Sequence, residues 1–176
     1  MCIRDRLEAG RDVNLVHSSA VAQTAPVELE KPVDEIVADL AGRGPGELKV
    51  WGEREFTSPL ASGSAKGGPL VVVPCSMGTA ARIKAGTSES LLLRAADVCL
   101  KERRPLILVP RETPMATHHL TNLAKLSKRG ALVIPAAPGF YHRPTTVAEL
   151  VDFIVQRVCD HLDVDVDLAP RWGDDA

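Results

Sequence analysis

Residues 70–86 read Leu-Val-Val-Val-Pro-Cys-Ser-Met-Gly-Thr-Ala-Ala-Arg-Ile-Lys-Ala-Gly, and this stretch decides the fold class. The four leading apolar residues do not alternate with polar ones, which is typical of a strand buried on both faces of a parallel sheet. Pro74 ends the predicted strand, and small hydroxyl and glycine residues lead into an Ala-rich helix. Because backbone N–H groups converge at such a turn, it predicts an anion site of cofactor size. The alternative is an ordinary strand-to-helix connection with Thr79 as the helix N-cap.

Two segments further along the chain repeat this layout. Residues 105–110 (Pro-Leu-Ile-Leu-Val-Pro) and 131–135 (Ala-Leu-Val-Ile-Pro) predict buried strands, and polar turns follow at 111–114 and 139–143. Helices are predicted over 90–103, over 117–129 and from Thr146 through Val158, with apolar faces that include Leu120, Val147 and Val151. Strands that alternate with helices imply a three-layer α/β domain with parallel strands. Ligands bind at the carboxyl ends of such strands, so we expect the three polar turns to share one rim.

The front of the chain carries weaker signals. Residues 12–17 and 48–51 predict short strands, and Pro32 with helical apolar spacing predicts a helix over 31–40. Residues 57–68 are too rich in small residues for regular structure. A loop of that length usually binds something, although a merely flexible loop is the alternative.

The helix predicted over 90–103 carries two cations away from its core. Leu92, Ala95, Ala96, Cys99 and Leu100 form its apolar stripe. Arg94 and Lys101 lie seven residues apart, roughly opposite that stripe. They form either a solvated basic face or one side of a site built between two subunits.

Composition limits the classes of function. The 176 residues fit a single domain over 1–176 with a C-terminal tail over 163–176, and 45% hydrophobic content is enough for a core. The net charge of −2 gives no reason to expect nucleic acid or a membrane surface as partner. The four cysteines are widely spaced, and the histidines lack a metal-ligand pattern, which predicts no metal and a reducing cytoplasm.

Several strings together resemble the UbiX-type flavin prenyltransferases. They are Ala-Ser-Gly-Ser (61–64), Pro-Cys-Ser-Met-Gly-Thr (74–79), Leu-Arg-Ala-Ala-Asp-Val (93–98), Leu-Lys-Glu-Arg-Arg-Pro-Leu (100–106), Leu-Val-Pro-Arg-Glu-Thr-Pro (108–114) and Gly-Phe-Tyr-His-Arg-Pro (139–144). The resemblance runs from about Val13 to Trp172 and implies a Rossmann-like (flavodoxin-like) α/β/α fold. It also implies transfer of the dimethylallyl group of dimethylallyl phosphate to N5 and C6 of reduced FMN, without a metal. The product, prenylated FMN, would serve a UbiD-type decarboxylase.

The resemblance also implies which residues form the site. Those that would hold FMN are Ser18, Ser76, Met77, Gly78, Thr79 and Arg111. Those that would surround dimethylallyl phosphate and the reacting carbons are Glu28, Ser62, Arg94, Lys101, Glu112, Tyr141 and Arg157, with Phe56 under the prenyl group. A homo-oligomer built of trimers, with a dodecamer as the full assembly, is implied as well.

The proposed chemistry explains these residue types. Breaking an allylic C–O bond puts negative charge on the departing phosphate, which suits Lys101, Arg94, Arg157 and the Tyr141 hydroxyl. Donors aimed at charge that grows in the transition state lower the barrier. A carboxylate such as Glu112 suits proton removal from C6 or stabilisation of the cation.

One departure from the family pattern concerns the front of the chain. Family members begin with a strand and a Gly-Ala-Ser-Gly turn that grips the flavin phosphate, and no residue before Val13 matches them. We therefore expect an N-terminally truncated domain. Two alternative functions stay open: an enzyme like the flavin-dependent cysteine decarboxylases, disfavoured because Pro110-Arg-Glu-Thr-Pro replaces their Pro-x-Met-Asn loop, and a non-catalytic flavin-binding subunit.

Overall fold

The computed structural model describes residues 2–173, and these fall into two compact units. We call residues 16–19 and 51–136 the sheet unit, and the described residues of 1–15, 20–50 and 137–176 the helical unit. The expectation of one domain over 1–176 stays a prediction.

Three parallel strands organise the sheet unit. They are β3 (Leu70–Cys75), β4 (Leu106–Pro110) and β5 (Leu132–Val133), in the order β3-β4-β5, as predicted. All five residues of β4 are buried, as a strand flanked on both sides should be. The prediction for β3 was partly wrong, because this strand continues through Pro74 to Cys75 and Val73 is 49% exposed. Within the described residues β3 lies at the edge of this sheet, which explains the exposure of Val73.

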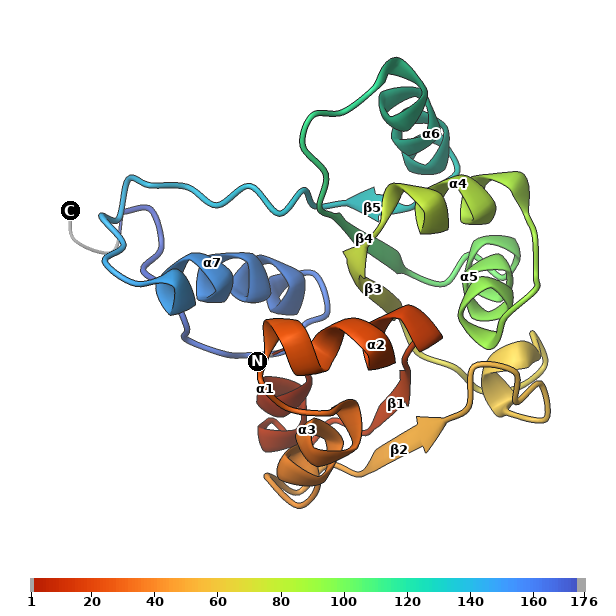
Figure 1. The fold of residues 1–176 in the computed structure, drawn as a ribbon, viewed down its shortest axis with the longest axis horizontal. Helices are drawn as coiled ribbons and strands as arrows, with labels where there is room; N and C mark the ends of the chain where they lie inside the picture. The colour runs from red at the N-terminus through yellow and green to blue at the C-terminus, as the bar shows by residue number, and fades with distance from the viewer. Residues whose placement is uncertain (1, 174–176) are drawn as a thin grey trace. The chain divides into compact units, whose positions relative to one another are not determined.

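Helices α4 (Met77–Ala85), α5 (Leu91–Lys101) and α6 (Thr117–Lys128) lie on the same side of this sheet (Figure 1). Right-handed crossovers that progress in one direction across a sheet place their helices on one face. The short 3₁₀ helix η1 (Pro59–Ala61) interrupts the loop expected over 57–68. The side chains that fill the core are Val72, Cys75, Ala80, Ile83, Leu93, Ala96, Leu106, Leu108 and Leu126.

Two details of these helices differ from expectation. The buried face of α5 is wider than the predicted stripe, since Leu91, Leu93 and Val98 are buried while Leu92 and Leu100 are half-buried. Leu120 on α6 was expected in the core and is 54% exposed. Helix α5 contacts η1, α4, β3 and β4, which widens its buried face, whereas α6 contacts α4 and β5 and leaves Leu120 outside these contacts.

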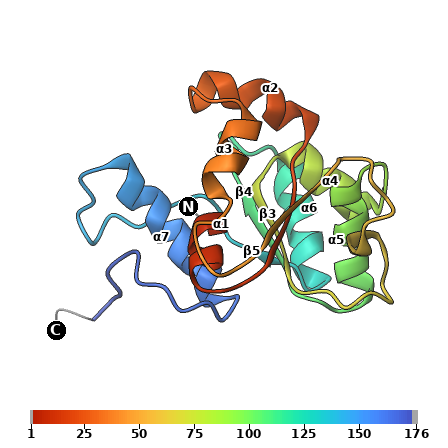
Figure 2. The ribbon, with the colours of Figure 1, turned by 90° about the horizontal axis from the view of Figure 1, so that it is seen from below.

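The helical unit contains α1 (Cys2–Glu8), α2 (Ser19–Glu28), α3 (Val33–Leu40) and α7 (Val147–Asp160), and the pair β1 (Val13–Val16) and β2 (Leu48–Trp51) forms a two-stranded sheet. Helix α2, whose apolar residues do not gather on one face and whose last turn holds Pro26, was not predicted. Helix α1 packs beside α7 (Figure 2). Val147 and Val151 were expected to be buried but are 76% and 42% exposed, because α7 buries its second half.

Residues 163–173, expected as a tail, pack against α7. Val164 and Ala169 are each 6% exposed, and the Leu168 N–H donates to Gln156 Oε1 at 2.8 Å. Residues 174–176 of the expected tail lie outside the described residues.

Candidate functional site

The polar turn after β3 forms the N-terminus of α4. Ser76 is the N-cap: its Oγ accepts a hydrogen bond from the Thr79 N–H at 3.1 Å and lies 3.0 Å from Thr79 Oγ1. The alternative with Thr79 as N-cap was therefore wrong. Met77 is 4% exposed and anchors the turn in the core, whereas a Cβ on Gly78 would meet no atom closer than Ser76 Oγ at 3.9 Å. First-turn N–H groups of a helix have no intrahelical acceptor, so this open turn can receive an anionic group.

The turn after β4 opens at the same edge of the sheet. The register pairs Cys75 with Pro110, so Arg111 and Glu112 follow β4 where Ser76 follows β3. Arg111 is exposed, while Glu112 is half-buried and its Oε1 accepts from the Thr113 N–H at 3.2 Å. Two of the three turns thus share one rim, as predicted, and the third (139–143) belongs to the helical unit.

Cys75 closes β3 directly before this turn and is fully buried. Burial disfavours the thiolate and raises the pKa of the Cys75 thiol to about 11, although a hydrogen bond from the Ala80 backbone lowers it slightly. Its side chain therefore contributes packing to the site rather than reactivity.

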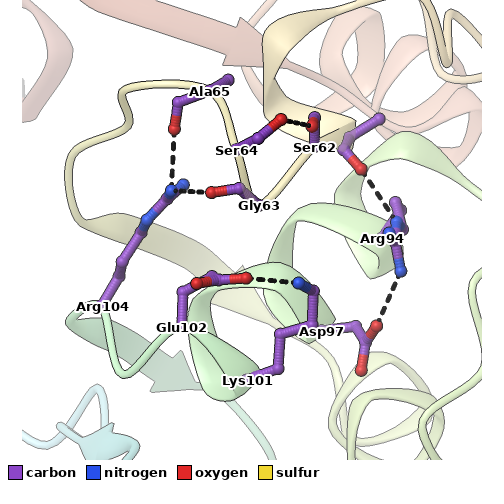
Figure 3. A network of polar contacts seen from close by, with 10 residues as sticks. Ser62, Gly63, Ser64, Ala65, Arg94, Asp97, Lys101, Glu102 and Arg104 are labelled. Atoms are coloured by element: carbon purple, nitrogen blue, oxygen red, sulfur yellow. Dashed lines mark hydrogen bonds and ion pairs between the residues drawn. The ribbon is translucent and has the colours of Figure 1, made fainter.

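Ser62, Arg94 and Lys101 are brought together where α5 packs on η1 and the loop that follows it (Figure 3). Arg94 Nε donates to the Ala61 carbonyl at 2.9 Å, and its Nη1 pairs with Asp97 Oδ2 at 2.9 Å. Ser62 Oγ lies 2.9 Å from Ser64 Oγ. At Arg94 the basic face of α5 thus meets a loop of its own chain, a contact that neither alternative from the sequence included.

Lys101 extends the same cluster toward the C-terminus of α5. Its ammonium forms an ion pair with Glu102, which lowers the pKa of the Glu102 carboxyl. Gly63 lies against this pair, since a Cβ at that position would come within 2.5 Å of Lys101 Nζ. Lys101 remains 46% exposed, so its ammonium is accessible to an anion that displaces Glu102.

Tyr141 and Arg157 lie in the helical unit, where they line a hollow of about 200 Å³. Its other lining residues are Phe153, Gln156, Asp160, Ala169, Pro170, Arg171 and Trp172. Asp160 forms ion pairs with Arg157 at 2.8 Å and with Arg171 at 2.9 Å. The hydrogen bonds from Arg171 hold the pKa of the Asp160 carboxyl below its usual range.

Sequence reasoning missed Arg171 and Trp172 as members of this hollow. The Trp172 ring packs edge-on against Tyr141 with centroids 5.2 Å apart. The only available signal was their position inside the stretch that resembles the family, which ends at Trp172.

Comparison with known proteins identifies the family. The Flavoprotein family model matches residues 3–159. A flavin prenyltransferase UbiX of Pseudomonas aeruginosa is 42% identical, over 93% of this chain and 82% of that protein. The chain belongs to the UbiX family of flavin prenyltransferases.

Two solved structures show the UbiX fold across almost the whole chain. The crystal structure of AnUbiX (PadA1) in complex with FMN and dimethylallyl pyrophosphate has a TM-score of 0.90 at 34% identity, covering 98% of this chain and 88% of that one. A dodecameric FMN-dependent UbiX-like decarboxylase from Escherichia coli O157:H7 has a TM-score of 0.84 at 36% identity, covering 96% and 90%. The predicted flavodoxin-like α/β fold is therefore confirmed.

The remaining residues expected from the UbiX resemblance come from segments other than α5 and the loop that follows η1. Ser18 is half-buried just before α2, and Phe56 is 46% exposed in the sheet unit. Glu28 is the exposed last residue of α2, in the helical unit. Their roles stay predictions.

Among residues 2–173, no group of three His, Cys, Asp or Glu side chains is arranged to hold a metal ion. None of the helices in the same residues is both long and apolar enough to cross a membrane.

Proposed function

We propose that this chain joins the dimethylallyl group of dimethylallyl phosphate to N5 and C6 of reduced FMN, giving prenylated FMN. The observation that carries the proposal is the cluster of Ser62, Arg94 and Lys101 in a chain 42% identical to a flavin prenyltransferase. Reduced FMN, when bound, supplies the nucleophilic atoms, and the chain supplies charge, orientation and a proton acceptor.

The N-terminus of α4 suits the anionic part of the flavin. Ser76 fixes the turn through its bond to Thr79, and the open surface of Gly78 lets a ligand approach the backbone. We assign FMN binding to this turn together with Arg111 and Ser18.

The role proposed for the cations is to bind the leaving phosphate. Lys101 offers a point charge and Arg94 and Arg157 offer paired donors, each held by a carboxylate neighbour in the present structure. We assign these three cations and the Tyr141 hydroxyl to the phosphate, whose negative charge grows as the allylic C–O bond breaks. Because the attraction between these cations and the phosphate strengthens as the C–O bond breaks, it lowers the barrier.

We assign the removal of the proton from C6 of the flavin to Glu112. Within residues 2–173, this half-buried carboxylate accepts a single hydrogen bond, at 3.2 Å from its neighbour's N–H, which leaves its other oxygen available. We place Ser62, Phe56 and Glu28 around the prenyl group, where they would exclude water from the allylic cation.

The direct test is product formation. The purified chain, incubated anaerobically with reduced FMN and dimethylallyl phosphate in the presence of EDTA, should yield a flavin heavier by one five-carbon unit in mass spectrometry. Omission of dimethylallyl phosphate is the control. A chain that binds FMN but yields no heavier flavin would favour the non-catalytic flavin-binding subunit.

We also propose that the chain acts as a homo-oligomer built of trimers. A related structure is dodecameric, and large apolar side chains are exposed here at Val27, Leu29, Phe140 and Val147. Light scattering should therefore report a trimer or a multiple of it. A fully active monomer would contradict the proposal.

The destination of the product is inferred from the family resemblance. Prenylated FMN is a modified cofactor, and we propose that a UbiD-type decarboxylase in the cytoplasm consumes it. Adding the reaction mixture to such a decarboxylase freed of cofactor should restore its activity, and a mixture made without dimethylallyl phosphate should not.

A further inference from the structure

Two arginines hold the backbone of the loop that carries Ser62. Arg104, in the turn after α5, donates from Nη2 to the carbonyl oxygens of Gly63 and Ala65 at 2.7 and 2.8 Å. Arg94, within α5, donates to the Ala61 carbonyl at 2.9 Å. Three alternate carbonyls of one short loop are thus bound by guanidinium groups, as Figure 3 shows.

Within the described part of the chain, the other hydrogen bonds of this loop are local, such as those from Ser62 to Ser64 and to Pro59. Residues 61–68 read Ala-Ser-Gly-Ser-Ala-Lys-Gly-Gly, which provide no large apolar side chain to pack and, at three glycines, little backbone restraint. Backbone carbonyls need hydrogen-bond partners, and here the guanidinium groups of Arg94 and Arg104 provide them. Gly67 lies close over the same guanidinium, because a Cβ there would come 2.5 Å from Arg104 Nη1.

The hydrogen bonds from Arg94 and Arg104 to the loop carbonyls fix the residues expected to act on the substrate. Ser62 lies between the bound carbonyls of Ala61 and Gly63. Gly63 in turn lies against the ammonium of Lys101. Releasing Gly63 would therefore move the Ser62 hydroxyl and uncover Lys101 together.

We propose that Arg104 is a positioning residue for prenyl transfer, which acts by fixing the loop over 61–67 and, through it, the relative placement of Ser62 and Lys101. The inference rests on the proposed function. Sequence reasoning assigned no role to Arg104, whose side chain is half-buried and whose Nη2 donates to two carbonyls of the loop.

The first experiment compares Arg104→Ala with Arg129→Ala. Arg129 is a matched control, since its guanidinium also donates to a backbone carbonyl of the sheet unit, that of Lys84 at 2.8 Å, far along the chain from the loop. Arg104→Ala should lower kcat for prenyl transfer by about thirtyfold or more, with FMN affinity within threefold of native. Free guanidinium ion should restore at least part of that kcat, and Arg129→Ala should keep kcat within threefold.

The second experiment disturbs the hydrogen bonds between Arg104 and the loop without removing Arg104. Gly67→Ala places a methyl group against Arg104 Nη1, whereas Gly68→Ala adds the same group in open space. Neither glycine has a positive φ, so both variants keep a relaxed backbone. Gly67→Ala should lower kcat by about tenfold, and Gly68→Ala should leave it near native.

Hydrogen exchange provides a readout that does not depend on activity. Amides of residues 61–67 should exchange faster in Arg104→Ala and Gly67→Ala than in their controls. Unchanged exchange would overturn the proposal, as would kcat near native in both variants or a loss of kcat that Arg129→Ala shares. If the native chain makes no prenylated flavin, the proposed function fails while the exchange result still decides whether Arg104 fixes the loop.

Discussion

Lys101→Ala should slow prenyl transfer by a factor of about 10²–10³ while FMN affinity stays within a few-fold of native. The side chain of Lys101 is 46% exposed and the partner of its ammonium in the structure is a carboxylate, so the ammonium is accessible to an anion. If it meets the phosphate as charge develops there, its loss acts on the barrier more than on binding. Single-turnover rates with dimethylallyl phosphate and a fluorescence titration of FMN measure the two quantities separately.

Two controls separate this effect from simple loss of an ion pair. Glu102→Gln breaks the same pair but keeps the ammonium, so its rate should equal or exceed the native rate. Lys125→Ala removes an exposed lysine from α6 and should leave the rate unchanged. If FMN affinity and rate fell equally in Lys101→Ala, Lys101 would contact the flavin rather than the phosphate.

Glu112→Gln should also reduce the rate by about a hundredfold or more, because an amide cannot accept the proton from C6. The substitution keeps the shape of the side chain and retains an oxygen for the bond from the Thr113 N–H. FMN affinity should therefore change little. Product formation followed by mass spectrometry gives the rate.

A matched control adds a second criterion for Glu112. Glu89→Gln makes the same substitution at an exposed position before α5 and should keep the native rate. A Glu112→Gln variant with the native rate would exclude Glu112 as the base.

The elements whose existence and type were predicted correctly depend on local signals, even where a bound or a buried residue was wrong. The apolar runs of β3 and β4 and the apolar spacing of α6 each sit within one short window of sequence. Helix α5 began as expected because Ser90 caps it, accepting from the Leu93 N–H. Helix α2 was missed since Pro26 and scattered apolar residues conceal its period.

The parts of the site that escaped prediction depend on contacts between distant residues. Arg104 meets Gly63 and Ala65 across 41 and 39 positions of the chain, and Arg94 meets Ala61 across 33. No periodicity records such a pairing, so an arginine bound to a carbonyl is indistinguishable in sequence from one in solvent. The residue types were available from the resemblance, but their partners were not.

Burial of Cys75 bears on how the protein tolerates its own cofactor. Reduced flavin exposed to air generates peroxide, and peroxide oxidises thiolates much faster than thiols. Because burial raises the pKa of the Cys75 thiol to about 11, Cys75 remains a thiol at neutral pH. The cysteine that precedes the proposed flavin turn should therefore survive oxidative stress that would inactivate an exposed, acidic thiol at the same place.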